Sequence, residues 1–517
     1  MTFAEQHLTK IDGVLHGFDR LIFKGYLSSF FPDKGIYYYL SQKGIRLLGY
    51  DKFMKTQQHL FRNHIDQIAK EEDVAIHYVN NSRNSKDQIA KKDFLKCPNK
   101  KGLISIISCK ETSPSFRLRG NKALKELEVI KENRQHLHYY LFYNDVEFGW
   151  MHFKIQSWYP FTIQIYVNGK EDLKRCLDKQ NIAYKTYDNS ITWVEDLEKA
   201  QQLAENLVTK KWDRFFNVLA NRINPFLSDI ESIFDRGYMW CTHQSEYASD
   251  VLFKKREELK GLYPGLIQHA TYFKGGEDIY TFFGRKLHHL STKEVTGSTK
   301  RFDQGFRVKH YLERNSVKMY DKNSVLRIET TINNSRAFKI YRDVVRKNIP
   351  TKAWVPMGKA VSNLYRCAQI AKSCNLKYLN SLSQVEEPKD WDKKIEQVSE
   401  STSRINKNKN PVKYSAFNLL SKQTCLILEA ISHGKFDIQP FSNKMLRQVL
   451  LEKNLFQIDV NDPSAIKKIS GKITRLIAKL RAHKVLQKIN RSFKYKLTKL
   501  GQSICYKILK FKKLELV

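Results

Sequence analysis

The stretch SVKMYDKNSVLRIETTINN, residues 316–334, contains two short apolar runs separated by Lys-Asn-Ser. Alternating Val, Ile and Leu on both sides of such turn-forming residues are typical of a β-hairpin. Charge interrupts both runs, because Asp321 lies in the first and Arg327 and Glu329 lie in the second. A buried carboxylate is costly unless it is paired. These three residues therefore indicate either a functional site or a network of ion pairs.

The length of the hairpin loop decides which of these side chains meet. A three-residue loop over 322–324 places Asp321, Arg327 and Glu329 on one face, since side chains alternate between the faces of a sheet. A two-residue loop moves Asp321 to the opposite face. In the first case the carboxylates repel each other unless a cation lies between them, and Mg²⁺ or Mn²⁺ would suit their oxygens. Asp321 and Glu329 are thus candidate catalytic and metal-binding residues, with a salt-bridge network as the alternative.

A second acidic pair occurs in HQSEYASDVLF, residues 243–253. We expect a helix here, in which Glu246 and Asp250, four residues apart, face the same side. Metal-dependent nucleases and strand transferases use carboxylates of this kind, so both residues are candidate catalytic groups. The alternative is a helix that pairs them with lysines such as Lys254.

The sequence HLHYY, residues 136–140, places His136 and His138 on one side of a predicted strand. This pattern resembles the metal-binding signature of rolling-circle replication initiators and related single-strand transferases, which attack DNA with a tyrosine. The resemblance implies that both histidines bind the metal. The alternative is coincidence, because the chain contains 15 histidines, and none of its 26 tyrosines is distinguished as a nucleophile.

The composition favours a polyanionic partner. The chain of 517 residues has 90 Lys and Arg against 53 Asp and Glu, a net charge of +37. Self-repulsion of this size is relieved by binding a polyanion, most commonly nucleic acid. An anionic membrane surface is the competing partner, but no apolar run approaches 18 residues. The eight cysteines show no zinc-binding spacing and the N-terminus no signal-peptide pattern, so we expect a cytoplasmic protein with reduced thiols.

The length predicts two to four domains. We expect a mixed α/β region over 1–101 and an α+β core over 102–383, built on an antiparallel sheet with a helical insertion. A polar linker should span 384–413, because it has few aliphatic residues. A C-terminal nucleic-acid-binding domain should span 414–517. The chain contains no phosphate-binding loop, dinucleotide fingerprint, zincin motif or nucleophile elbow.

The C-terminal region contains a strongly basic amphipathic helix. Residues 464–514 include 16 Lys or Arg and no acidic residue. An apolar stripe and a basic face follow helical spacing in this stretch. The stripe consists of Ile469, Ile473, Leu476, Ile477 and Leu480, and the basic face of Lys468, Lys472, Arg475 and Lys479.

The text LRAHKVLQKINRSFKYKLTKLG that ends this region resembles the helix–wing–helix segment of MarR-type transcription regulators. The resemblance implies a winged helix-turn-helix whose helix around 471–484 enters a major groove. Arg491, Lys494 and Lys496 on the wing would then contact the nucleic-acid backbone. The alternative is a protein-interaction module with a solvated basic face.

Basic residues beside strand-like text predict further nucleic-acid contacts in the core, and nearby aromatic rings could stack on unpaired bases. The candidate contacts are Arg20, Lys24, Arg117, Arg119, Lys318 and Arg327.

Two wider resemblances point to a mobile element or a replication system. VKMYDKNSVLRIETTIN is similar to text in replication-initiation proteins of plasmids and filamentous phages. FDRLIFKGYL, FGWMHFKIQSWYPF and SEYASDVLF resemble a large bacterial family with many copies per genome. The second of these families carries no settled chemistry. From the charge, the acidic residues and these resemblances together, we expect a nucleic-acid-binding protein that cuts or joins strands with a divalent metal. A non-enzymatic DNA-binding regulator, or the protein partner of a structured RNA, is the alternative.

Overall fold

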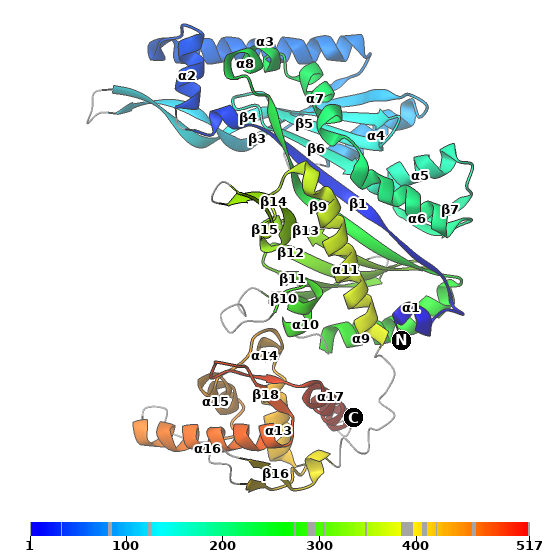
Figure 1. Cartoon of the computed structure of the whole chain (residues 1–517), viewed down its shortest axis with the longest axis vertical. Coiled ribbons are helices and arrows are strands. Elements are labelled where there is room, and N and C mark those ends of the chain that lie inside the picture. Colours follow the sequence, from blue (N-terminus) through cyan, green and yellow to red (C-terminus); the bar gives the residue numbers. More distant parts are fainter. Residues whose placement is uncertain are drawn as a thin grey trace. The chain divides into compact units, whose positions relative to one another are not determined.

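The computed structural model (Figure 1) describes residues 2–32, 34–80, 85–121, 126–272, 276–286, 295–302, 305–346, 349–383, 397–405, 411–419, 421–456 and 462–514. The chain divides into two compact units. Unit 1 comprises Met1–Val14, Asp250–Thr330 and Ser373–Val517, and unit 2 comprises Leu15–Ser249 and Thr331–Lys372.

Unit 2 is built on a sheet in which neighbouring strands follow the order β9-β1-β6-β5-β4-β3-β2. Strands β1, β6, β5, β4 and β3 pair antiparallel along this order, and β2 runs parallel to β3. In chain order it contains most of β1 (Ile11–Leu27), α2 (Gly35–Gln42), α3 (Tyr50–Glu71), β2 (Ile76–Val79), α4 (Lys86–Lys96), β3 (Gly102–Asn121), β4 (Glu126–Asp145), β5 (Gly149–Gln156), β6 (Ile163–Asn168), α5 (Gly169–Lys179), β7 (Tyr184–Tyr187), β8 (Ser190–Val194), α6 (Leu197–Glu205), α7 (Trp212–Ile223), α8 (Leu227–Phe234), most of β9 (Tyr238–Phe253), β14 (Lys339–Arg346), β15 (Ile349–Pro356) and the start of α11 (Leu364–Leu382).

Alternation of side chains fixes the two faces of this sheet. In β5 and β6, and in β1 from residue 20 onward, apolar residues that are buried alternate with residues that are more exposed. The apolar face packs against helices, as shown by Phe23 of β1 beside Trp212 of α7 and by Phe61 of α3 stacked on Tyr139 of β4. This pattern is typical of an antiparallel sheet with one covered face.

Unit 1 contains a second group of antiparallel strands, in the order β10-β11-β12-β13 with the end of β9 beside β13. Phe253 at that end of β9 donates its backbone N–H to the carbonyl of Ser324, just before β13. The elements of this part are α1 (Phe3–Gln6), α9 (Arg256–Tyr272), α10 (Gly276–Phe282), β10 (Val295–Phe302), β11 (Gly305–Leu312), β12 (Asn315–Lys322) and most of β13 (Val325–Ile332).

The C-terminal part of unit 1 has its own hydrophobic core, to which Ile469, Ile473 and Ile477 contribute. Its elements are β16 (Thr402–Ile405), β17 (Pro411–Tyr414), α13 (Lys422–Ile431), α14 (Gly434–Ile438), α15 (Asn443–Glu452), α16 (Pro463–Ala482), β18 (Leu486–Lys488), β19 (Tyr495–Leu497) and α17 (Lys499–Leu514). Helix α16 begins with two favourable signals, because the Asp462 side chain accepts from the Ser464 N–H and Pro463 occupies the first helical position.

The expected mixture of helices with a mostly antiparallel sheet is confirmed, and helices α5 to α8 lie between β6 and β9 in the chain. Residues 384–396 and 406–410 of the predicted linker lie outside the described residues. Within the rest of that range, β16 pairs with β17, and the side chain of Val398 is buried in the C-terminal core.

Candidate functional site

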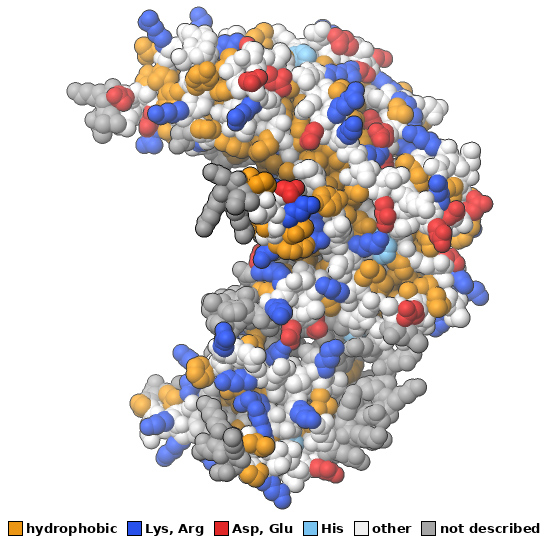
Figure 2. Space-filling model, viewed as in Figure 1, with side chains coloured by type: hydrophobic (Ala, Val, Ile, Leu, Met, Phe, Trp, Pro, Cys, Tyr) orange, Lys and Arg blue, Asp and Glu red, His pale blue; other side chains and the backbone are white. Residues whose placement is uncertain are grey.

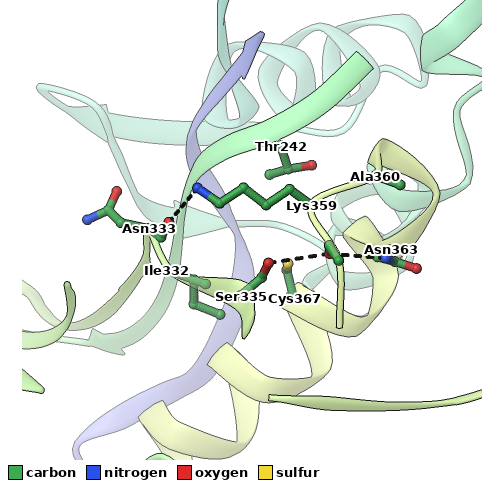
Figure 3. Close-up of a pocket in the computed structure, with 9 residues that line it drawn as sticks. Thr242, Ile332, Asn333, Ser335, Lys359, Ala360, Asn363 and Cys367 are labelled. Carbon is green, nitrogen blue, oxygen red and sulfur yellow. Dashed lines mark hydrogen bonds between the residues drawn. The ribbon is translucent and has the colours of Figure 1, made fainter. Parts of the chain in front are cut away.

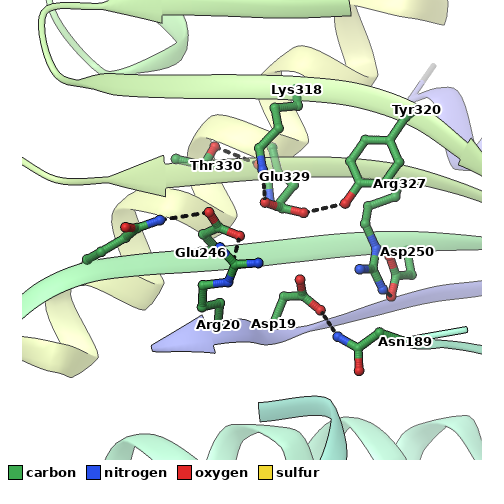
Figure 4. A network of polar contacts seen from close by, with 12 residues as sticks. Asp19, Arg20, Asn189, Glu246, Asp250, Lys318, Tyr320, Arg327, Glu329 and Thr330 are labelled. Atoms are coloured by element: carbon green, nitrogen blue, oxygen red, sulfur yellow. Dashed lines mark hydrogen bonds and ion pairs between the residues drawn. The ribbon is translucent and has the colours of Figure 1, made fainter. Parts of the chain in front are cut away.

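The hairpin of unit 1 has a two-residue loop, since β12 ends at Lys322 and β13 begins at Val325. Glu329 accepts a hydrogen bond from the hydroxyl of Tyr320 and forms an ion pair with Lys318 (Figure 4). Even-numbered side chains of β12 therefore point toward Glu329.

Asp321 consequently points to the other face, since side chains alternate along β12. It is half-buried and lies beside Tyr263 of α9. The three-residue loop that would have joined Asp321 to Glu329 is wrong. The described turn needs Asn323 at φ 65°, which Asn tolerates better than most residues.

Glu329 is 1% exposed and remains ionised. Burial alone would raise the pKa of its carboxyl. The charges of Lys318 and Arg327, with the hydrogen bonds from Lys318 and Tyr320, outweigh burial and lower this pKa to about 2.

Asp250 and Arg327 form the second buried pair of unit 1. Arg327 donates from Nε to Oδ1 of Asp250 at 2.6 Å and from NH2 to Oδ2 at 2.9 Å. The two side chains are 0% and 1% exposed. The predicted helix around Asp250 is wrong, because residues 238–253 form strand β9. Along a strand, residues four apart also share a face, so the spacing of the two acids fitted both structures.

Glu246 lies in the part of β9 that belongs to unit 2, where it is nearly buried. Its carboxylate is 3.8 Å from Nε of Arg20 and accepts a hydrogen bond from Gln244 (Figure 4). Carboxylate oxygens of Asp19 and Glu246 lie within 4.8 Å of one another. Asp19 also accepts a hydrogen bond from Asn189 at 2.6 Å. Asp19 was not predicted from the sequence. The signal that could have identified it is an acidic residue next to Arg20 within an amphipathic strand.

His136 and His138 are both buried in β4, 7% and 3% exposed. Burial lowers the pKa of each ring to about 4, so both are neutral at pH 7. His138 uses Nδ1 to donate to the carbonyl of His136, and the His136 ring stacks on Trp158 at 5.3 Å. In the described part of the chain Nε2 of His136 has no hydrogen-bond partner.

A further ionic cluster of unit 2, which sequence reasoning missed, surrounds Glu111 of β3. Its carboxylate accepts from the Tyr140 hydroxyl at 2.6 Å and from Nζ of Lys154 at 2.5 Å, and Lys86 lies at 3.1 Å. Burial would raise the pKa of Glu111, but these partners lower it to about 2. Tyr140 is two residues after His138 and therefore shares a face of β4 with it. This alternation was the sequence signal that could have pointed to Tyr140.

The cations predicted to bind nucleic acid occupy three kinds of position. Lys318 and Arg327 are buried, at 8% and 1% exposure, so they cannot reach phosphates as placed. Arg117 and Arg119 are exposed on β3, and Arg117 pairs with Glu132 at 3.4 Å. Arg20 and Lys24 point to the more exposed face of β1, along with Gln164 of the neighbouring strand β6.

On α16 the basic face is exposed. Lys468, Lys472 and Arg475 are exposed, whereas Lys479 is partly buried, with Nζ 4.1 Å from the centre of the Phe417 ring and hydrogen-bonded to Ser415. Figure 2 shows Lys and Arg side chains outnumbering acidic ones over these C-terminal elements.

In the turn between β18 and β19, Arg491 is exposed with φ 56°. Lys494 is partly buried close to β19, and Lys496 within β19 pairs with Glu277 of α10. Of the three predicted wing contacts, Arg491 is therefore the most accessible.

A small pocket of unit 2 lies between β9, the end of β13 and the start of α11 (Figure 3). It has an empty volume of about 230 Å³ including open solvent, and none of the predicted site residues line it. Lys359 at its rim donates from Nζ to the carbonyl of Asn333 at 2.9 Å. The pocket contains the hydroxyl of Thr242, which is buried and lacks a hydrogen-bond partner in the described part of the chain.

No protein-family model, curated protein or solved structure matches this chain. Among the described residues, no helix is long and apolar enough to cross a membrane.

Proposed function

We propose that this chain binds nucleic acid through its C-terminal elements, with α16 as the helix that enters a major groove. The observation that carries the proposal is that α16 has one exposed basic face and one buried apolar face. Lys468, Lys472 and Arg475 are exposed, while Ile473 and Ile477 anchor the helix in the C-terminal core. A helix fixed by one face and basic on the other presents several cations at once to a phosphate backbone.

The order of elements supports a winged helix-turn-helix. Helices α13, α15 and α16 share one core and are followed by the β18–β19 hairpin. Phe441, just before α15, forms a bridge with Tyr495 and so adds a third strand position to that hairpin. In such a module the third helix reads the groove and the hairpin contacts the flanking backbone. Arg491 at the tip of the hairpin is the corresponding backbone contact.

Electrostatics support the same partner. Residues 464–514 contain no acidic residue, so the surface of α16 and the hairpin repels other cations and attracts phosphate. The cap residue Asp462 is at the opposite end of α16 from Lys479 and Arg481. A protein-interaction module would not require this complete exclusion of acidic residues.

The experiment compares the wild-type chain with K468Q/K472Q/R475Q on a fluorescent duplex of about 25 base pairs. Loss of three phosphate contacts should weaken binding at least about tenfold at moderate salt. The control variant K52Q/K55Q/K70Q removes three exposed lysines from α3 and should bind like the wild type. Equal affinity of the α16 variant and the wild type would reject the proposal. Duplex RNA and single strands, measured in parallel, identify the preferred nucleic acid.

Metal-dependent strand cleavage stays a prediction from the sequence. Arg327 and Lys318 supply positive charge beside Asp250 and Glu329, where Mg²⁺ was expected. We therefore propose nucleic-acid binding as the function, as in a regulator or in a protein of a replication system or mobile element.

A further inference from the structure

On three neighbouring strands of unit 2, one face of the sheet combines cations and aromatic rings and carries no acidic residue of its own. It consists of alternate residues on three neighbouring strands, here called the polar sheet face. Arg20 is exposed and the other nine are partly buried, whereas the residues between them are mostly buried. The members are Arg20, Ile22, Lys24 and Tyr26 of β1, Gln164, Tyr166 and Asn168 of β6, and Trp150, His152 and Lys154 of β5.

Strand register arranges these residues in rows across the sheet. Lys24 pairs with Gln164, which pairs with Lys154. In the next row Ile22 pairs with Tyr166, which pairs with His152. Neighbours in a row lie about 5 Å apart. A basic row therefore runs beside a row of rings, and the rings of Tyr166 and His152 are stacked 5.0 Å apart.

The acids near this face already have partners, and two of these acids are beside two of its three cations. Glu111 binds Lys154, and Glu246 lies 3.8 Å from Arg20. Asp87 of α4 accepts from the indole N–H of Trp150. Asp19 is bonded to Asn189.

Lys24 differs from the other two cations, because no hydrogen bond or ion pair in the described part of the chain joins it to a carboxylate. Burial lowers the pKa of its amine, and the charges of Lys154 and Lys359 lower it further. An anion placed beside Lys24 would relieve this repulsion.

Lys359 extends the basic region next to Lys24, and the neutral ring of His243 lies close to both lysines. The N–H of Thr242 donates to the carbonyl of Lys359 at 2.8 Å, which holds that segment against β9. Strand β9 in turn packs closely on β1, since a Cβ on Gly25 would lie 2.5 Å from the Trp240 ring. His243 is kept neutral, as burial and the charges of Lys24 and Lys359 lower its pKa to about 4.

We propose that the polar sheet face binds a single strand of nucleic acid, with phosphates at Lys24 and Lys359 and bases against Tyr26 and Tyr166. Cations that follow the backbone and rings that stack on bases are what sequence-tolerant single-strand binding requires. The ten residues of the polar sheet face include no acid, and the carboxylates that reach its cations, Glu111 and Glu246, contact Lys154 and Arg20 rather than Lys24. The proposal shares its ligand class with the proposed function, but it uses different residues.

The test uses the full chain, a fluorescent strand of 20 thymidines and a duplex of the same length. K24Q should weaken single-strand binding about fivefold, and K24E, which reverses the charge, by more. Each lost phosphate contact should lower the slope of log affinity against log salt by about 0.7. Duplex affinity should stay at the wild-type value. K52Q and K52E are matched controls at an exposed lysine of α3 and should bind both ligands normally.

Stability separates a binding role from a structural one. Because neighbouring cations repel Lys24, K24Q should keep or raise the urea midpoint, whereas a structural lysine would lower it. Wild-type affinity of K24E for the single strand, or an equal loss in K52E, would overturn the proposal. The α16 variant distinguishes the two proposals, since it should lose duplex binding alone. If the α16 variant kept its affinity for the duplex while K24E lost affinity for the single strand, only the proposed function would fail.

Discussion

Arg327 and Asp250 form a two-point ion pair with almost no exposure to solvent, with Nε to Oδ1 at 2.6 Å and NH2 to Oδ2 at 2.9 Å. Removing one member leaves a buried charge without its partner. We predict that R327M lowers the free energy of unfolding by about 3–5 kcal/mol, as measured by urea denaturation. R327K should also be strongly destabilising, because lysine cannot form both hydrogen bonds.

The double variant R327M/D250L tests the same pair without leaving a charge behind. It should be clearly more stable than R327M, since replacing both partners by apolar side chains avoids the isolated carboxylate. If the loss of stability in the double variant equalled the sum of the losses in R327M and D250L, the two side chains would not be energetically coupled, which would contradict the prediction.

Glu329 tests whether its surroundings hold a metal. We predict that E329Q is folded but less stable, because Lys318 loses its buried counter-charge. Adding 5 mM MgCl₂ or MnCl₂ should leave the melting temperature of the wild-type protein unchanged. A metal-dependent rise in the wild type that is absent from E329Q would instead support the metal site expected from the sequence.

His138 makes stability depend on pH. Its pKa is lowered to about 4 by burial, from an ordinary value of 6.5. Below pH 6.5 the unfolded chain therefore binds a proton that the folded chain rejects. The stability is complete above pH 6.5 and decreases as the pH falls toward 4. His136, His152 and His243 should act in the same direction.

We predict that H138Q reduces the slope of unfolding free energy against pH between 4 and 6.5 by up to about 1.4 kcal/mol per pH unit. Urea titrations at several pH values measure this slope. H59Q, a change at an exposed histidine of α3, is the control and should match the wild type. A wild-type slope in H138Q would show that this ring titrates normally.

Strands with clear alternation of apolar and polar residues could be predicted from the sequence. Which strands lie next to one another, and which distant side chains meet, could not. Residues 243–253 were expected to be helical, and on that helix Glu246 and Asp250 would share a face. Residues four apart share a face in a strand as well, so this spacing does not distinguish the two structures. Strand β9 is identified by its partners, such as Arg327, which is 77 residues from Asp250. No local pattern contains that pairing.

A turn signal in the sequence does not mark a turn where a strand has an unpaired side. A Ser-Pro pair such as Ser113-Pro114 is a typical turn signal. Strand β3 nevertheless continues through it, and Pro114 pairs with Asn133 of β4. On its other side β3 is paired with β2 only over Ile106 to Cys109. Pro114 therefore lies where one side of β3 has no strand partner in the described ladder, and proline is tolerated there because its missing N–H is not needed.

The candidate residues of the C-terminal elements were the easiest to predict, because a basic face and an apolar stripe on one helix need only helical spacing. Lys468, Lys472 and Arg475 are exposed as that spacing requires. Lys479 is one turn further along, and its place beside Phe417 depends on a distant segment that the spacing does not reveal.

The salt dependence of duplex binding tests the central claim most directly. Affinities of the wild type and of K468Q/K472Q/R475Q should be measured by fluorescence anisotropy from about 50 to 300 mM KCl. If three phosphate contacts are made by α16, the slope of log affinity against log salt should be shallower by about 2–3 in the variant, with its circular dichroism unchanged. Identical slopes in the two proteins would contradict the account.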